Sequence, residues 1–372
     1  MVALRGFVPR EGYRQREAAR SLPPLLLAQG RCAGVRTPVA TGADLRRAGR
    51  AVVRALGARI SPDARRQAET FWNEKHERDA ANRLAERPAA DPIDYTCHGL
   101  LYAHAVSAPL TGQVGRYWLE DVGERWLVPP PARMLAIGCG PAFIEDQILE
   151  RNFAGRIVAF DLAPRAIEGA RRRLAATPWK DRIELVAGDP LEADLQTGSF
   201  DAVFAEASLH HVVRIEEMFA LIHRVLVPGG LLLFDEYVGP DLTQYPPHLL
   251  QILNQLNACL APELRRDYLT GEVRERVEVC PLEWMERNDP TEGIHASQIL
   301  PLTRQFFEIL DQRPYGGGVL RPLMSRILLN FDFESNLRDQ TIGRLLAFID
   351  GELSRAGVIE NHNVVVVARR QP

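Results

Sequence analysis

The sequence predicts an α/β protein: a mostly parallel sheet with helices on both faces. Three observations support this fold class. A short apolar strand, Met134–Ile137, runs into the glycine-containing turn Gly138–Ala142. Between residues 132 and 235, β-type apolar runs alternate with segments of helical periodicity, as in parallel sheets with right-handed crossovers. Near the end of the sequence, Asn363–Arg369 is a β-branched run typical of a strand.

The individual elements follow from apolar periodicity and from helix and turn signals. Pro246 and Pro247 suit the first turn of a helix, and leucines at helical spacing continue it over 249–260. The expected strands are 133–138, 156–161, 182–187, 199–205, 230–235, 306–310 and 363–369. Further helices are expected at 66–72, 98–104, 115–126, 163–175, 215–227, 297–302, 327–331 and 342–353.

Composition narrows the class of protein and its partners. The chain has 372 residues, of which 46% are hydrophobic, and a formal net charge of −3, so no basic field favours a nucleic-acid partner. The five cysteines are widely spaced, which indicates neither a disulfide framework nor a zinc site. We therefore expect a cytoplasmic protein without a bound metal. No apolar run approaches the roughly 18 residues of a spanning helix, so no membrane partner is expected.

The first part of the chain differs from the rest in charge. Residues 1–66 hold fourteen arginines against four acidic residues, with little apolar periodicity. We expect 1–65 to be a disordered extension, with a transit-type segment and binding to an anionic surface as alternatives. A helical region, 66–130, and a core domain, 131–372, should follow. Within the core domain, 241–304 is expected to form a helical lid.

The glycine turn and the next strand form a unit suited to a nucleoside. Gly138 and Gly140 allow the backbone to turn sharply and to approach a ligand closely. Asp161 ends the second expected strand, where a carboxylate accepts hydrogen bonds from ribose hydroxyls. A dinucleotide-binding enzyme is one alternative, but its fingerprint needs a small residue where this chain has Phe143.

The spacing Gly138-x-Gly140-x-Ala142 resembles motif I of class I S-adenosylmethionine-dependent methyltransferases. Three further stretches resemble the later motifs of that core, in order, so the resemblance covers 130–240. They are Ile183–Asp189 for the third strand, Phe200–Val212 for the fourth strand and its loop, and Arg224–Asp235 for the Pro-Gly-Gly turn and fifth strand. Pieces that resemble a bacterial small-molecule subgroup are Tyr237–Pro240, Asp289–Glu292, Pro314–Gly317 and Asn330–Asp332.

The resemblance implies a Rossmann-like, seven-stranded sheet whose last strand is antiparallel and lies between the fifth and sixth. It also implies S-adenosyl-L-methionine as the cofactor, with its ribose at Asp161 and its adenine near Asp189. A helix-capping role for Asp161 and a turn role for Asp189 are the alternatives. The family usually has an acid where this chain has Ala136, and Glu145 is a candidate replacement. The expected cofactor-binding residues are Gly138, Gly140, Ala142, Asp161, Leu162, Asp189, Pro190 and Glu206.

Candidate catalytic residues follow the fourth and fifth strands. Transfer of a methyl group needs alignment of the acceptor and removal of its proton, and a histidine suits the second task. His210 is the first candidate base and His211 the second, with capping of the next helix as the alternative for both. Glu236 closes the fifth strand, where a carboxylate could position an acceptor hydroxyl.

The expected function is methyl transfer to a small-molecule acceptor. The resemblance favours a hydroxyl oxygen of a glycan sugar or of a natural-product intermediate. The alternatives are a non-catalytic nucleoside-binding relative, which Ala136 favours, and a dinucleotide-dependent oxidoreductase. The sequence leaves the oligomeric state open.

Overall fold

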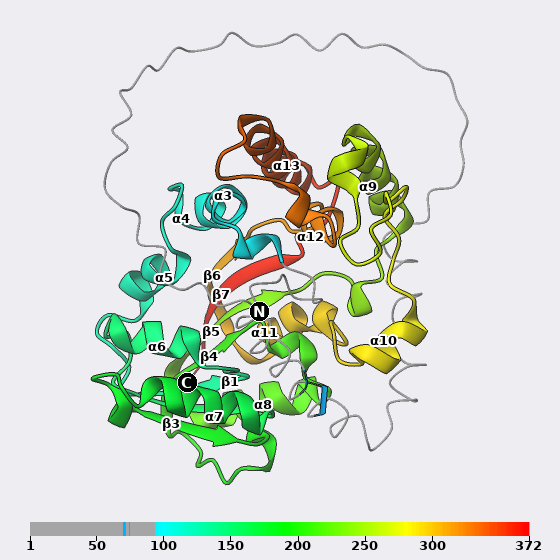
Figure 1. Ribbon diagram of the computed structural model, residues 1–372. Coiled ribbons are helices and arrows are strands. Elements are labelled where there is room, and N and C mark those ends of the chain that lie inside the picture. Colours follow the sequence, from blue (N-terminus) through cyan, green and yellow to red (C-terminus); the bar gives the residue numbers. More distant parts are fainter. Residues whose placement is uncertain (1–69, 72–73, 75–93, 372) are drawn as a thin grey trace, which may run out of the picture.

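The computed structural model describes residues 70–71, 74 and 94–371, so the expected extension 1–65 and most of 66–93 lie outside the described residues. The described residues form one seven-stranded sheet, in the order β3-β2-β1-β4-β5-β7-β6, with helices around it (Figure 1). The strands are β1 (Arg133–Ile137), β2 (Arg156–Asp161), β3 (Ile183–Ala187), β4 (Phe200–Glu206), β5 (Leu226–Tyr237), β6 (Glu308–Pro314) and β7 (Asn363–Arg369).

The strand directions confirm the predicted sheet. Strands β1 to β5 pair in parallel, whereas β7 is antiparallel to both of its neighbours, β5 and β6. The carboxyl ends of β1, β2, β4 and β5 therefore meet at one edge, where open α/β sheets bind ligands.

Two strands, β5 and β6, depart from their predicted bounds by more than one residue. Strand β5 begins at Leu226, four residues early, because the chain stays paired with β4 through a register shift at the Pro-Gly-Gly turn. Strand β6 occupies 308–314 because Phe306 ends the preceding helix, where its ring lies 6.4 Å from that of Phe219.

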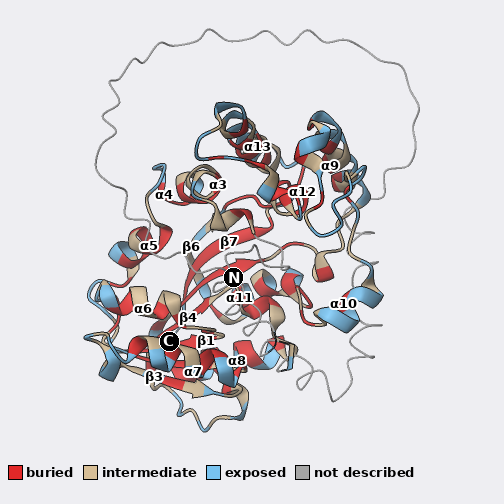
Figure 2. Cartoon of the chain, in the orientation of Figure 1, coloured by how far each residue is buried: buried red, intermediate tan, exposed pale blue. Residues whose placement is uncertain are grey.

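Helices cover the two faces of the sheet through alternating strand residues. In β4, Val203 and Ala205 pack on the face that α8 (Ile215–Val225) and α11 (Ile299–Phe306) cover. Ala202 and Phe204 pack on the opposite face, whose cluster includes side chains of α5 (Trp118–Trp126), α6 (Phe143–Glu150) and α7 (Pro164–Leu174). Figure 2 shows the strands buried between these layers.

A second group of helices joins the beginning and the end of the described chain. The turns around α3 contact α13, and α12 contacts α9 (Figure 1). Arg313 of β6 donates to the carbonyl oxygen of Leu110 in α4 at 2.9 Å and pairs with the buried Asp121 of α5 at 2.6 Å, which ties α4 to the sheet edge. The elements are α3 (Gly99–Leu101), a π-helical segment (Tyr102–Ser107), α4 (Ala108–Thr111), α9 (Pro247–Cys259), α12 (Leu320–Met324) and α13 (Leu337–Arg355).

The segment after β5 is helical, as expected, and a helix predicted after β6 is shorter than expected. The predicted helix 327–331 is a single 3-10 turn, Leu328–Asn330, because the next regular helix starts only at Leu337, after an Asn336 cap. In α10 (Leu282–Asn288), Met285 is buried and Trp284 is 53% exposed, so Met285 is the inward residue. None of the helices in the described ranges is long and apolar enough to cross a membrane.

Candidate active site

The glycine turn after β1 requires its glycines. Gly138 has a φ of +67°, and a Cβ there would lie 2.4 Å from the Cβ of Ser208. Gly140 also has a positive φ, +51°, and its N–H donates to Asp161 Oδ2 at 2.7 Å. Ala142 adopts a φ of +55° although it is not a glycine, so its backbone is strained at the start of α6.

Two charged side chains hold this turn. Asp161 accepts from Gly140 N–H through one oxygen and from Ala163 N–H, at 2.8 Å, through the other. Arg173 of α7 donates to the carbonyl oxygens of Pro141 and Ala142 at 2.9 and 2.8 Å. Asp161 is therefore a structural residue of the turn, and its carboxylate retains lone pairs for a further donor. Its role toward ribose stays a prediction.

Acidic side chains gather at the carboxyl edge of the sheet. Glu145, Glu206 and Asp235 come from α6, β4 and β5, and burial raises the pKa of Glu145 to about 8 and that of Glu206 to about 7. Glu145 Oε2 is buried and has no hydrogen-bond partner in the structure. Among the described residues, no arginine or lysine forms an ion pair with any of the three. Such a cluster of acids is suited to a cationic ligand.

Tyrosines from distant segments line the same region. The hydroxyl of Tyr315 donates to Asp235 Oδ1 at 2.7 Å. The Tyr117 hydroxyl is buried without a hydrogen-bond partner, and the charges of Glu206 and Asp235 contribute to its raised pKa, for which burial is the main cause. Polar groups therefore face the acids from both ends of the described chain.

His210 and Glu236 form a buried pair beside these acids. His210 Nδ1 lies 2.6 Å from Glu236 Oε2, and Glu236 Oε1 accepts from the backbone N–H groups of Ser208 and Leu209, both at 2.6 Å. Burial lowers the pKa of His210, but the charge and hydrogen bond of Glu236 outweigh it, so the net shift is upward. Because Glu236 holds Nδ1, Nε2 is the nitrogen left for proton transfer.

His211 points toward the segment between α10 and α11. Its Nδ1 lies 3.3 Å from Thr291 Oγ1, and its Nε2 lies 3.6 Å from Glu292 Oε2. Burial, followed by the neighbouring His210, lowers the pKa of His211 to about 3. His211 is therefore a neutral imidazole near pH 7, fixed by partners from a distant part of the chain.

Arg321 closes this side of the site. Its guanidinium lies 3.3 Å from Glu292 Oε1 and 4.8 Å from the centre of the Tyr237 ring. The loop that leads to it is held by Asp350 of α13, which accepts from the backbone N–H groups of Gly317, Val319 and Leu320.

The structure brings together most of the sequence-predicted residues. His210, Glu236 and Glu206 lie in one region, and Asp161 contacts the glycine turn. Asp189 accepts from Leu191 N–H at the start of a 3-10 turn and pairs with Arg214, so it has the turn role left open above. Its contact with adenine, like those of the neighbouring Leu162 and Pro190, stays a prediction.

Sequence reasoning missed the residues that approach from elsewhere in the chain. Thr291 and Glu292 stand in the sequence motif Asp289–Glu292, to which the sequence assigns no role. Tyr117 carried no signal, because an aromatic residue in an amphipathic helix is normally part of the core.

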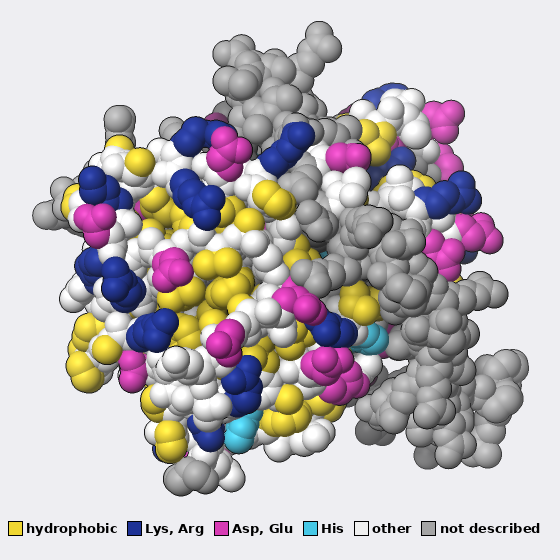
Figure 3. Space-filling view, turned by 90° about the horizontal axis from the view of Figure 1, so that it is seen from below, with side chains coloured by type: hydrophobic (Ala, Val, Ile, Leu, Met, Phe, Trp, Pro, Cys, Tyr) yellow, Lys and Arg dark blue, Asp and Glu magenta, His cyan; other side chains and the backbone are white. Residues whose placement is uncertain are grey.

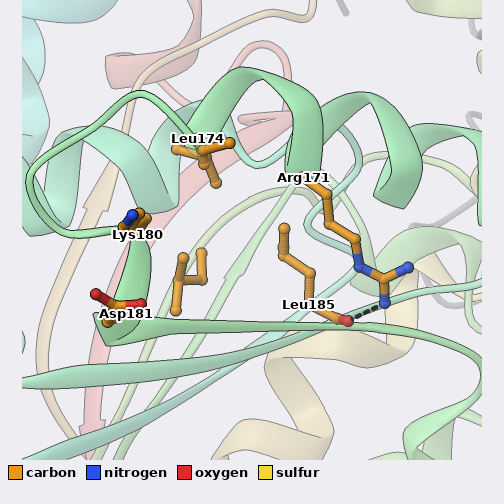
Figure 4. A pocket seen from close by; sticks show the side chains of 7 residues that line it. Arg171, Leu174, Lys180, Asp181 and Leu185 are labelled. Carbon is orange, nitrogen blue, oxygen red and sulfur yellow. Dashed lines mark hydrogen bonds between the residues drawn. The ribbon is translucent and has the colours of Figure 1, made fainter.

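A separate surface pocket of about 280 Å³ lies between α7 and β3 (Figure 4). Arg171 donates there to the carbonyl oxygen of Leu185 at 2.6 Å, and Lys180 and Asp181 come from the approach to β3. The pocket therefore borders the beginning of an edge strand, away from the strand ends that carry the acids and His210.

Comparisons with known proteins address the same region. A family model described as a methyltransferase domain matches residues 135–234. The malonyl-[acyl-carrier protein] O-methyltransferase of Legionella pneumophila is 32% identical over 128 residues, 33% of this chain and 44% of that protein. The ubiquinone/menaquinone biosynthesis C-methyltransferase UbiE of Cereibacter sphaeroides is 27% identical over 143 residues, 38% and 55% of the two chains. The chain thus spans about half the length of these curated relatives.

Solved structures also resemble this chain, at low identity. The [4+2]-cyclase SpnF is 16% identical, with 84% of this chain and 97% of that one covered and a TM-score of 0.45. A geranyl diphosphate methyltransferase in complex with GPP and sinefungin is 14% identical, with 69% and 78% covered and a TM-score of 0.41.

Three observations point to the same kind of domain: the strand order of the sheet, the glycine turn after β1 and the family match over the first five strands. The match to a methyltransferase domain thus covers residues 135–234, which include the glycine turn.

Proposed function

We propose that the protein transfers a methyl group from S-adenosylmethionine to a small-molecule acceptor, at a hydroxyl oxygen. The observation that carries this proposal is the group of acids at the sheet edge, Glu145, Glu206 and Asp235, beside the buried His210–Glu236 pair. The acids are suited to a cationic ligand, and the His210–Glu236 pair beside them is suited to removing a proton.

The residues present fit the cofactor. Its ammonium and sulfonium groups carry positive charge, which matches Glu145 and Glu206, and Glu145 has an oxygen without a hydrogen-bond partner. We assign Glu145 the part that an acid at position 136 has in the family. When bound, the cofactor supplies an electrophilic methyl group.

The chain's own residues prepare the acceptor. Glu236 keeps His210 in one orientation and stabilises its protonated form, and Nε2 takes the proton of the acceptor hydroxyl as the oxygen–methyl bond forms. Deprotonation makes the oxygen a stronger nucleophile, and the proton leaves the site through the imidazole. His211 lies beside this ring, 4.1 Å between centres, and borders the acceptor side.

The segment 241–304 forms the cover of the acceptor side in this proposal. It supplies Thr291, which contacts His211, and Asp241, which accepts from Ser297 N–H at 2.9 Å and so ties the two ends of the segment together. A cover excludes water and shapes the acceptor pocket. A glycan sugar and a natural-product intermediate are the acceptors that we favour.

One face of the described residues supports a small acceptor over a nucleic acid. On the face shown in Figure 3, acidic and basic side chains are interspersed around an apolar centre and do not form a basic tract. A phosphate backbone requires such a tract.

Calorimetry tests the cofactor assignment. The protein should bind S-adenosylmethionine and its demethylated product but not NAD. Asp161→Ala should weaken cofactor binding about 10- to 100-fold, the range for loss of hydrogen bonds to a charged group. Asp194→Ala, at an exposed aspartate, is the control and should bind normally. Binding of NAD, or an unchanged affinity in Asp161→Ala, would show that the nucleoside site is assigned wrongly.

A further inference from the structure

Three potential metal ligands converge beside the proposed base. One ring nitrogen each of His210 and His211 and a carboxylate oxygen of Glu292 all lie within 4.8 Å of one another. The histidines follow β4, whereas Glu292 comes from the segment between α10 and α11. His210 is buried and the other two are half-buried. The cluster is thus built by tertiary packing, and not by adjacent residues on one exposed surface.

Nδ1 of each histidine ring already has a partner. His210 Nδ1 contacts the Glu236 carboxylate at 2.6 Å, and His211 Nδ1 contacts Thr291 Oγ1 at 3.3 Å. Metal-binding histidines are typically oriented in this way, by a hydrogen bond at the nitrogen that does not bind the metal. On His210 the other nitrogen, Nε2, would bind a metal ion, and on His211 it would be Nε2, which already lies 3.6 Å from Glu292 Oε2.

The carboxylate is oriented as well. Glu292 Oε1 lies 3.3 Å from the Arg321 guanidinium, and Oε2 lies 3.6 Å from His211 Nε2. The positive charge of Arg321 opposes a cation here, but Glu236 and Glu292 contribute two carboxylates, and Asp94 lies 3.8 Å from Arg321 on its other side. The carboxylates outnumber the arginine at this site.

We propose that His210, His211 and Glu292 bind a divalent first-row transition-metal ion, such as Zn²⁺ or Co²⁺. Two imidazoles and one carboxylate, with a position left for water, form a known ligand set for these ions. Bonds of about 2.0–2.1 Å place ligand atoms roughly 3.4 Å apart. The side chains therefore need to close by about an ångström. This proposal replaces the expectation, drawn from the sequence, of no metal.

The ion has a consequence for catalysis, and this part rests on the proposed function. An ion on Nε2 of His210 occupies the lone pair that would take the acceptor's proton. The bound ion should therefore inhibit methyl transfer, without entering the region of Glu145 and Asp161 where the cofactor is proposed to bind. The site would make the activity sensitive to the concentration of free zinc.

Co²⁺ is the probe for this site, because its visible absorption reports nitrogen and oxygen ligation directly. The full-length protein, freed of metal with EDTA, should bind one Co²⁺ with an absorption band of a low-coordinate site. His211→Gln and Glu292→Gln should each weaken binding by about tenfold or more, since loss of even an outer partner has that effect. His223→Gln is the matched control, because His223 lies on α8 against Phe306 and Phe307.

The outcomes separate this proposal from the proposed function. No Co²⁺ band, or equal affinity in the wild type and both variants, would overturn the metal site. Calorimetry on the same samples then shows whether S-adenosylmethionine still binds; intact binding would leave the proposed function standing. Inhibition of methyl transfer by Zn²⁺ that EDTA reverses would support the inhibitory role of the ion. Faster methyl transfer with Zn²⁺ would contradict that role.

Discussion

Replacing His210 with glutamine should slow methyl transfer by roughly 10²–10⁴-fold, the usual contribution of a general base. Glutamine can still donate a hydrogen bond to Glu236, whose other oxygen accepts from Ser208 and Leu209, so the local structure should persist. The affinity for S-adenosylmethionine should stay within a few-fold. The measurement is the initial rate with labelled cofactor, alongside calorimetry of cofactor binding.

A second variant and a control sharpen this test. Glu236→Gln removes the charge but keeps an oxygen for the two backbone donors, so it should also slow transfer with little effect on cofactor affinity. His223→Gln should leave both unchanged. If His210→Gln transferred methyl groups at the wild-type rate, or lost cofactor binding and turnover equally, His210 would not be the base.

Affinity for S-adenosylmethionine should rise with pH between about 6 and 8. Burial raises the pKa of Glu145 to about 8 and that of Glu206 to about 7, and a bound cation favours their charged forms. Each linked carboxylate can change the affinity by up to about tenfold per pH unit. The groups that act on Glu145 are Asp161, Glu206 and Arg173, and those that act on Glu206 include Glu236 and His210.

The free energy of unfolding of the ligand-free protein should instead fall as the pH rises. A carboxyl whose folded pKa is raised stabilises the fold below its ordinary pKa, and this contribution is lost as pH rises through the folded value. For Glu145 the window is about pH 4.5 to 8. Thermal unfolding should show a decline over that range, which the cofactor reverses. Glu145→Gln should flatten both curves, and the exposed Glu216→Gln should not. A pH-independent affinity in the wild type would refute the charge argument.

The sequence predicted the sheet and half of the site, for local reasons. The alternation of strands and helices along the chain, the glycine turn and the histidines after β4 all lie in short stretches of sequence. In such stretches, apolar periodicity and turn residues indicate the local structure. The His210–Glu236 pair had a signal in the sequence as well, since both residues follow strands of a parallel sheet, whose carboxyl ends lie at one edge.

The rest of the site could not be predicted because it arises from long-range packing. No local pattern in the sequence indicates that Glu292 and Arg321 approach His211. None indicates that Tyr117 lies near Glu206 and Asp235. The orientation of α10, in which Met285 is buried and Trp284 is exposed, had no local signal either. In a helix of seven residues, α10, two adjacent apolar side chains do not reveal which one faces the interior.

Transfer of a labelled methyl group tests the central claim most directly. The protein would be incubated with methyl-labelled S-adenosylmethionine and separate panels of sugars, hydroxylated aromatic compounds, tRNA and duplex DNA. The account predicts label in at least one hydroxylated small molecule, as an acid-stable ether, and in neither nucleic acid; His210→Gln should abolish most of it. Label in the nucleic acids, or a small-molecule product formed equally well by His210→Gln, would contradict it.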